Sequence, residues 1–501
     1  MELPNQEYLG YYPDAELVLA VVCPIGTPYK PVTDALSDYL RHFGYQTELI
    51  KVSDFFEELL AELGGCATPS GDLPKDIALR KIRAGNEIRR LSRQNDVMAL
   101  VAAGVIADKR RTATQKVGRK QDQKRSLPRS RTAYIISTVR RPEEVTTLRR
   151  VYGDGFFLVG VNASKGSRER YLEQQGIVGD EATRIMETDA KEKLDPDHGQ
   201  STRDAFQMAD VFLSADSKDE HSGGQVSRFL DLLFGCPTIT PSPQEQAMFM
   251  AYASSLRSGD LSRQVGAAII DPQGDLISVG CNEAPRFGGG LYDPPSELAT
   301  SHRDIELGED SNEREKRAMA ERIVEALGAG VDGIVVRKSL KTAGFFDITE
   351  FGRAVHAEME ALLACSRSGR SARDATLFTT TFPCHNCTRH ILAAGIKKVI
   401  YIEPYSKSRA STLHPDEIAV DHEENGKLPF LPFVGVGPRR YFDLFSVSLS
   451  TGYPVERKQD GRVSSWSRKT APLRMQVKPS TYLQREDLAY AELNRIRSRH
   501  G

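Results

Sequence analysis

Apolar runs and segments of helical spacing alternate along the first half of the chain. Leu17–Cys23 is an uninterrupted apolar run, which predicts a strand buried on both faces of a parallel sheet. Pro31 can open the helix that follows, in which Val32, Leu36 and Phe43 share one face. Strands that alternate with helices are typical of a doubly wound α/β domain. The same pattern predicts further strands at Ala133–Ser137, Phe156–Val161 and Val211–Leu213, and further helices at Val97–Ala107, Pro142–Tyr152 and Gln225–Phe234.

The pattern changes after Cys236–Pro243, a proline-bearing segment that we interpret as a linker. Val265–Asp271 and Leu276–Cys281 flank a short turn and predict a β-hairpin. An insertion of about residues 284–352 follows, rich in glycine and charged side chains. Within it, Asn312–Ala329 has helical spacing.

The end of the chain is assigned to the second half. From Arg440 the sequence is strand-like, and a charged helix is predicted at Arg485–Arg497. We therefore expect two domains, residues 1–240 and residues 241–501, the second with a C-terminal extension.

Composition narrows the class of protein. The chain has 501 residues, of which 40% are hydrophobic and 27% charged, a balance typical of folded globular domains. The net charge of -1 gives no general attraction to nucleic acid or to an acidic membrane. The sequence shows neither a secretory signal pattern nor an apolar run long enough to span a membrane. Seven cysteines, an odd and sparse number, favour a reducing cytoplasm over a disulfide framework.

One segment departs from this neutral balance. Between Lys109 and Arg131 there are ten basic residues and one acid, Asp122, with few apolar side chains. A solvated surface loop is the favoured interpretation. The alternative is an arm that binds a phosphate-rich ligand or nucleic acid, because clustered cations gain from counterion release.

The strongest chemical signal is the set His356, Glu358, Cys384 and Cys387. Catalytic zinc sites use three nitrogen or sulfur ligands and keep a fourth position open. His356 and the Cys-x-x-Cys pair supply three such ligands, and the cysteines can face one ion if a helix begins between them. The alternative is a closed structural zinc site, for which His385 or Cys365 would be the fourth ligand.

Glu358 is left free for proton transfer. Residues two apart diverge by roughly 200° on an ideal helix, so His356 and Glu358 can reach one cavity only if the histidine lies at the helix start. Glu358 is then predicted to take a proton from a water at the metal and to pass protons to the substrate. On the same helix, Val355, Met359, Leu362 and Leu363 are predicted to face the core.

The His-x-Glu and Pro-Cys-x-x-Cys motifs form the zinc deaminase signature. The region from about Met248 to Ile418 resembles the cytidine and deoxycytidylate deaminase family, through SRQVGAAIID, SVGCNEAP, ATLFTTTFPCHNC and ILAAGIKKVIYIEPY. The resemblance implies an α/β/α three-layer domain that binds Zn²⁺, and it places Asn282 against the nucleotide sugar, although a turn residue is the alternative. Tyr405, Lys407 and Ser408 are expected to hold substrate phosphate, with a solvated loop as the alternative.

The first strand, turn and helix resemble the opening of a P-loop nucleotide kinase. Gly26 and Lys30 match parts of that family's phosphate loop and are the candidate nucleotide-binding residues. Tyr29 replaces the glycine before the lysine, and Pro31 replaces the Ser or Thr that would meet Mg²⁺. The kinase-like fold is expected, whereas phosphoryl transfer does not follow.

Together the two halves resemble the bacterial anti-phage dCTP deaminases, through segments such as RRPEEVTTLRRVYGDGFFLVGV and NEAPRFGGGLY. That resemblance implies deamination of dCTP and dCMP in defence against phage. The altered phosphate loop motivates the further hypothesis that the N-terminal domain responds to a nucleotide or nucleic-acid effector. Deaminases of this type commonly assemble, so a homo-oligomer is expected. The competing interpretations are a deaminase that edits RNA or single-stranded DNA and a non-catalytic nucleotide-sensing regulator that keeps zinc for structure.

Overall fold

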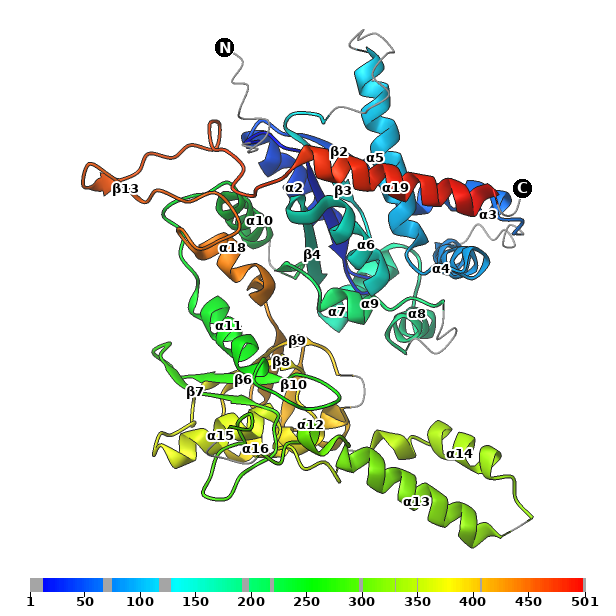
Figure 1. Ribbon diagram of the computed structural model, residues 1–501, viewed down its shortest axis with the longest axis vertical. Coiled ribbons are helices and arrows are strands. Elements are labelled where there is room, and N and C mark those ends of the chain that lie inside the picture. Colours follow the sequence, from blue (N-terminus) through cyan, green and yellow to red (C-terminus); the bar gives the residue numbers. More distant parts are fainter. Residues whose placement is uncertain are drawn as a thin grey trace. The chain divides into compact units, whose positions relative to one another are not determined.

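The computed structural model describes residues 12–65, 74–116, 128–191, 198–216, 220–296, 301–328, 330–348, 350–405 and 408–498. The chain forms two compact units (Figure 1). Unit 1 comprises Met1–Glu245 and Val434–Gly501, and unit 2 comprises Gln246–Phe433. No helix in these described ranges is both long and apolar enough to cross a membrane.

The core of unit 1 is a mostly parallel sheet. Its strands lie in the order β12-β5-β4-β1-β3-β2, and only β12 runs antiparallel to its neighbour. Strands β1, β3 and β4 are buried along their whole length, which explains their unbroken apolar sequences and confirms the predicted buried strands. The bounds are β1 (Leu17–Val22), β2 (Gln46–Ile50), β3 (Thr132–Ile136), β4 (Phe156–Asn162), β5 (Val211–Ser214) and β12 (Gly435–Val436).

Helices pack on this sheet in two groups, α2 with α10 and α5 with α6 and α19 (Figure 1). Helix α2 buries Val32, Leu36 and Leu40, the apolar face that the sequence predicts. The alanine-rich segment after residue 97 is helical, as expected, and continues to Lys116. The helices of this unit are α2 (Lys30–His42), α3 (Phe56–Glu62), α4 (Pro74–Ser92), α5 (Val97–Lys116), α6 (Pro142–Tyr152), α7 (Lys165–Gln174), α8 (Asp180–Lys191), α9 (Thr202–Phe206), α10 (Glu220–Leu233), α18 (Tyr441–Phe445) and α19 (Pro479–Ser498).

The C-terminal tail corrects the expected domain boundary. Val434–Gly501 belongs to unit 1 and not to the second domain, because β12 pairs with β5 and α19 packs on α5 and α6. The segment after Arg440 was expected to be a strand but forms the short helix α18. The Arg440 side chain pairs with Asp443 three positions later, a spacing that a helical turn brings together.

The basic run between residues 109 and 131 is not an arm where it is described. Residues 109–116 continue helix α5, and residues 117–127 lie outside the described residues. Five basic side chains of this run form ion pairs with acidic residues of unit 1, which largely neutralise their charge. The pairs are Lys109 and Arg129 with Glu48, Arg110 with Glu16 and Glu486, Arg111 with Asp108, and Arg131 with Asp14.

Unit 2 is built on a mixed sheet with strand order β10-β11-β9-β8-β6-β7. Strand β6 is antiparallel to both β7 and β8, which confirms the predicted hairpin, and the remaining pairs are parallel. The strands are β6 (Gly266–Ile270), β7 (Leu276–Cys281), β8 (Thr376–Thr381), β9 (Lys398–Glu403), β10 (Ile418–Val420) and β11 (Leu428–Pro432). The helices are α11 (Pro243–Ser255), α12 (Asp304–Leu307), α13 (Ser311–Leu327), α14 (Gly333–Thr342), α15 (Ala357–Arg367), α16 (His385–Ala393) and α17 (Ala410–Leu413).

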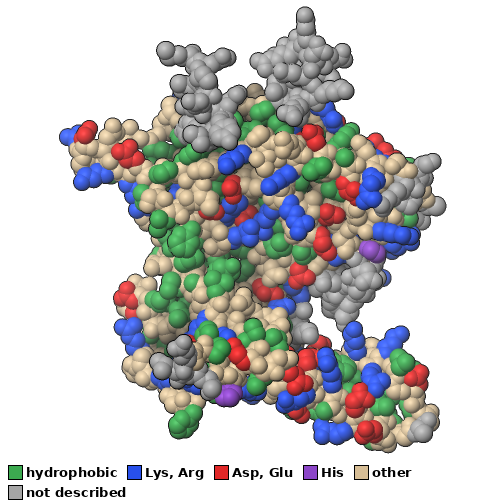
Figure 2. Space-filling model, viewed as in Figure 1, with side chains coloured by type: hydrophobic (Ala, Val, Ile, Leu, Met, Phe, Trp, Pro, Cys, Tyr) green, Lys and Arg blue, Asp and Glu red, His purple; other side chains and the backbone are tan. Residues whose placement is uncertain are grey.

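The predicted insertion forms a helical hairpin, α13 and α14, that extends away from the sheet of unit 2 (Figure 1). Asp310 caps α13 by accepting hydrogen bonds from the backbone N–H groups of Asn312 and Glu313. Figure 2 shows basic and acidic side chains mixed over this hairpin. One such pair, Arg337 with Glu321, links the two helices.

Candidate active site

The position of His356 is set by the start of helix α15. His356 is the N-cap residue, with extended backbone angles, so its side chain lies at the helix end and not on its flank. The preceding residue, Val355, exchanges backbone hydrogen bonds with Glu283 at 2.9 and 3.2 Å. Helix α15 also approaches β7 closely at Gly280, where a Cβ would lie 2.3 Å from the carbonyl oxygen of Ala357. The sequence prediction that the histidine lies at the helix start is therefore confirmed.

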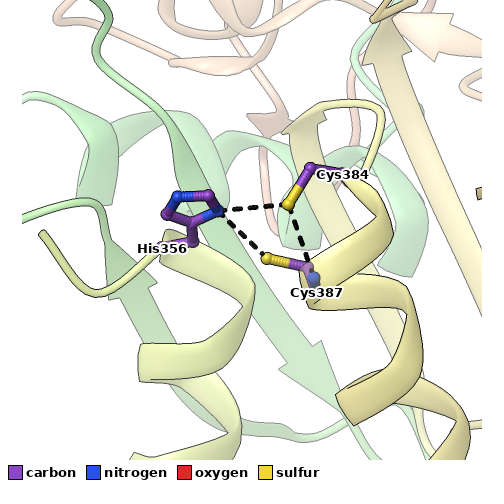
Figure 3. A group of neighbouring side chains, drawn as sticks. All are labelled: His356, Cys384 and Cys387. Atoms are coloured by element: carbon purple, nitrogen blue, oxygen red, sulfur yellow. Dashed lines mark hydrogen bonds between the residues drawn. The ribbon is translucent and has the colours of Figure 1, made fainter. Parts of the chain in front are cut away.

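Cys384 and Cys387 flank the start of helix α16. Cys384 is its N-cap residue, and its sulfur accepts a hydrogen bond from the backbone N–H of Cys387 at 3.4 Å. Nδ1 of His356 lies 3.3 Å from each of the two sulfurs (Figure 3). The start of α15 and the start of α16 thus bring together the three predicted ligands.

This donor set fits zinc. The ligand atoms of His356, Cys384 and Cys387 all lie within 4.8 Å of one another. Tetrahedral zinc, with Zn–N of about 2.05 Å and Zn–S of about 2.3 Å, requires a nitrogen–sulfur separation of about 3.6 Å. The observed 3.3 Å is close to that value. Cys365, proposed as a fourth ligand of a closed site, instead has its sulfur 3.1 Å from the hydroxyl of Ser278 and is not in the group.

The electrostatics of the site favour a metal-binding thiolate. A hydrogen bond from Cys387, followed by the interaction with His356, lowers the pKa of Cys384 to about 4. The hydrogen bond with Cys384 and burial raise the pKa of Cys387 well above its usual range. The hydrogen bond with Cys384 raises the pKa of His356 to about 9. Cys384 is therefore the sulfur that ionises more readily, and a divalent cation bound by both sulfurs would displace the proton of Cys387.

Glu358 lies beside the ligands but faces the cavity. It is only 4% exposed, and its Oε2 accepts a hydrogen bond from the Cys387 thiol at 3.4 Å. Burial, with a further contribution from the negative charge of Cys384, raises its pKa to about 7. A carboxyl group with this pKa can both accept and release a proton near neutral pH, as a general acid–base catalyst must.

A cavity of about 180 Å³ opens over this group. Asn282 and Tyr405, two of the predicted substrate residues, line it together with His356, Glu358 and Cys384. The amide of Asn282 accepts from the N–H of Val265 at 2.7 Å and donates to the carbonyl of Arg263 at 2.8 Å. Asn282 therefore shapes the cavity wall as well as lining it. Lys407 lies outside the described residues, and Ser408 donates a hydrogen bond to the carbonyl of Pro383.

The sequence reasoning missed several further lining residues, among them Arg263, Arg353 and Phe382. Arg263 lies with its guanidinium 5.6 Å from the ring centre of Tyr405 and pairs with Glu403 at 2.5 Å. Arg353, from the end of the insertion, pairs with Asp304 at 2.8 Å. Phe382 packs edge-on against the buried ring of Tyr401 and also lines the cavity. Arg263 is close in sequence to the β6–β7 hairpin, and Arg353 is close to His356. This proximity could have indicated that both arginines belong to the site.

The two predicted residues of the N-terminal phosphate loop are not brought together. Gly26 lines a separate cavity in unit 1, where its φ of +85° and its close approach to Arg168 and Leu172 require glycine. The Lys30 side chain is 75% exposed and pairs with Asp34 on the outside of α2 at 2.5 Å. The expected nucleotide contact by Lys30 is therefore not supported by its position.

The fold and the site together define a class of metal-binding deaminase, and the comparisons agree. Residues 241–403 match the model of the cytidine and deoxycytidylate deaminase zinc-binding region. This match, together with the His/Cys/Cys group, identifies zinc as the cofactor. Nucleotide deamination is the activity that the match supports.

The chain belongs to the cytidine and deoxycytidylate deaminase family. It is 31% identical over 163 residues to the deoxycytidylate deaminase of Enterobacteria phage T4, covering 32% of this chain and 77% of that relative. It is 26% identical over 183 residues to the probable deoxycytidylate deaminase of Drosophila melanogaster, covering 35% and 70%. The apo dCMP deaminase of cyanophage S-TIM5 is 19% identical over 39% of this chain and 100% of that chain, at a TM-score of 0.22, and adds nothing to this conclusion.

Proposed function

We propose that unit 2 hydrolyses the 4-amino group of deoxycytidine nucleotides, dCMP, dCTP or both, to give the corresponding deoxyuridine nucleotide and ammonia. The observation that carries this proposal is the placement of the buried Glu358 carboxyl 3.4 Å from the Cys387 sulfur, inside the cavity that the metal-binding group lines. The deoxycytidylate deaminases among its relatives supply the substrate class.

The proposed chemistry uses the chain's own groups as follows. His356, Cys384 and Cys387 would hold zinc, which when bound would act as a Lewis acid and lower the pKa of a water to about 7. Glu358 accepts a proton as water adds to C4 of the cytosine ring, and it delivers that proton to the ring nitrogen N3. Glu358 then takes the proton of the new hydroxyl group on C4 and delivers it to the 4-amino group, so the C4–N bond breaks, ammonia leaves and C4 becomes a carbonyl. Burial of Glu358 keeps these proton transfers away from bulk solvent.

The remaining lining residues would orient the substrate. Phe382 offers an aromatic surface to the base, and Asn282 keeps one amide hydrogen for a sugar hydroxyl. Arg263 and Tyr405 lie together at the cavity and would bind the 5′-phosphate. Arg263 is half in solvent, as expected of a group that meets a charged ligand at an opening.

We further propose, from the family resemblance, that the enzyme acts on the cytoplasmic nucleotide pool and depletes dCTP during phage infection. Unit 1 would be a kinase-like domain that binds an effector and no longer transfers phosphate. The strand order β5-β4-β1-β3-β2 supports that fold. The exposed position of Lys30, which pairs with Asp34, supports the loss of phosphate transfer. Assembly into a homo-oligomer belongs to the same proposal.

The test is a product assay on purified full-length protein. The substrates are deoxycytidine, dCMP, dCTP, CMP, CTP and a single-stranded deoxycytidine-containing oligonucleotide, each with and without a zinc chelator. We expect ammonia and a deoxyuridine nucleotide from dCMP or dCTP, loss of turnover on chelation, and recovery with added zinc. Turnover of the oligonucleotide alone would identify an editing enzyme. Tightly held zinc without any turnover would identify a regulator, and either result would overturn the proposal.

A further inference from the structure

Unit 1 contains its own cavity, of about 260 Å³. It lies where the chain leaves the carboxyl ends of the parallel strands: Gly26 and Thr27 follow β1, Val52 follows β2, and Arg140 follows β3. Open parallel α/β sheets bind their ligands beyond this edge. The volume is near the low end of the range of about 300–1,000 Å³ for ligand pockets, so the cavity fits a small ligand.

The walls carry an excess of positive charge. Lys81, Arg89 and Arg140 line the cavity, against a single carboxylate, Glu144. That carboxylate is already engaged, since it accepts from Arg89 Nη2 at 2.9 Å and from the backbone N–H of Arg140 at 2.8 Å. The described lining therefore has a net surplus of cations, which favours an anionic ligand.

Buried polar atoms in the same walls lack partners among the described residues. Oγ1 of Thr27, in a residue that is 2% exposed, makes no hydrogen bond, and neither does Nε of Arg89, which is also 2% exposed. Oε1 of the half-buried Gln200 is a third such atom. A buried polar group without a partner destabilises the folded protein, so three such atoms in residues that line one cavity favour a ligand that pairs with them.

The chemistry of these atoms specifies the ligand. The Thr27 hydroxyl and the Arg89 N–H can donate to phosphate oxygens, whereas the Gln200 carbonyl needs a hydroxyl or amine donor from the ligand. The lining also includes apolar and aromatic side chains, Phe56 and Ile82 among them. An anion with a polar donor and a flat or apolar body matches all three features.

We propose that this cavity binds a small phosphate monoester of about nucleoside monophosphate size. The phosphate lies against Thr27, Lys81 and Arg89, and the body of the ligand lies against Phe56 and Ile82. The site is separate from the zinc cavity of unit 2 and needs no contact with Lys30. It rests on the effector binding proposed above for unit 1, whose ligand it names by class, and does not depend on the reaction proposed for unit 2.

The test is isothermal titration calorimetry of full-length protein with AMP, GMP, UMP, ribose 5-phosphate and inorganic phosphate. We expect one equivalent of at least one monoester to bind. Thr27→Val should weaken that binding about tenfold or more by removing a hydrogen bond to a charged group. Lys81→Ala should weaken it about fivefold or more. Arg83→Ala is the matched control, because Arg83 is on the same helix, exposed and outside the lining.

A melting curve of the ligand-free variants separates binding from a structural role. Because Thr27 Oγ1 has no partner in the described protein, Thr27→Val should leave the unfolding temperature unchanged or slightly higher. A lower unfolding temperature for this variant would assign the hydroxyl a structural role and contradict the proposal. No saturable binding of any probe, or binding that Thr27→Val and Lys81→Ala leave unchanged, would overturn it as well.

Discussion

The Arg110 guanidinium forms an ion pair with the carboxylate of Glu486, 376 positions later, and both side chains are fully buried. Arg110 Nε also lies 3.1 Å from both oxygens of Glu16, at the start of β1. Tyr152 donates a hydrogen bond to Glu486 and Tyr482 donates one to Glu16, at 2.7 and 2.6 Å. This network joins helix α19 to the sheet and helices of unit 1.

Arg110→Met should destabilise unit 1 by about 3–5 kcal/mol, because it leaves two buried carboxylates without their cation. Burial raises the pKa of Glu486. A buried carboxyl group with a raised pKa destabilises the folded state once it is ionised, so the free energy of unfolding falls as the pH rises through that pKa. The destabilisation caused by Arg110→Met should therefore be larger at about pH 8 than at about pH 5.5. Urea unfolding at both values measures the difference. Arg41→Ala, in an exposed pair, should change stability by about 0.5 kcal/mol or less. Equal losses for Arg110→Met at both values would contradict this account.

Glu358→Gln should lower kcat by about 10²–10⁴ while zinc content and unfolding temperature stay close to those of the native protein. The amide has a similar shape but cannot accept and return a proton. Glu360→Gln is the control, because Glu360 is on the same helix but pairs with Arg367 and does not line the cavity. Deamination rate and metal content per folded protein are the measurements. Native turnover by Glu358→Gln would remove the proton-transfer role.

Cys387→Ser should lose zinc, activity and thermal stability together, because the site would retain two of its three strong ligands. Chelation of the native protein should have the same effect and be reversed by zinc. Cys365→Ala provides the matched comparison and should keep its metal, since its sulfur contacts Ser278 and not the ligand group. Elemental analysis decides the point. Zinc loss from Cys365→Ala would favour a closed four-ligand site.

Asn282→Ala should both destabilise unit 2 by about 1–3 kcal/mol and raise KM about tenfold, because it frees two backbone groups of the cavity wall. The lost bonds are those to Val265 and Arg263. Asn282→Asp keeps the oxygen that accepts from the Val265 N–H, so its stability and its KM should lie between those of the native protein and those of Asn282→Ala. Thermal melting and steady-state kinetics with dCMP or dCTP measure these effects. A change in KM with no change in melting would leave Asn282 with a substrate contact alone.

The sequence predicted elements best where burial dictates the pattern. Strands β1 and β4 are buried on both faces, and an uninterrupted apolar run has few other interpretations. The zinc ligands were also predictable, because their spacing follows from helix starts. The core face of α15 was predicted less well: Leu363 is exposed, whereas the small residues Ala361 and Cys365 are buried where the helix lies close to the sheet.

Features that depend on distant partners could not be predicted. The basic run was interpreted as a loop because Glu48 and Glu486, which neutralise part of it, lie far away in sequence. The tail after Arg440 alternates like a strand, but Leu444 and Phe445 are buried next to each other on a helical turn. The cavity of unit 1 likewise collects residues from separate loops, so no local pattern marks it.

Because Val434–Gly501 belongs to unit 1, the deaminase unit is an insertion within unit 1, between Glu245 and Val434, and is joined to unit 1 at both of its ends. A deletion from the C-terminus would therefore remove part of unit 1 before it reached the deaminase unit, unit 2. A fragment from about residue 241 to residue 501 would carry α19 without the helices α5 and α6 on which it packs. Only a piece trimmed on both sides, about residues 246–433, respects the way this polypeptide is partitioned.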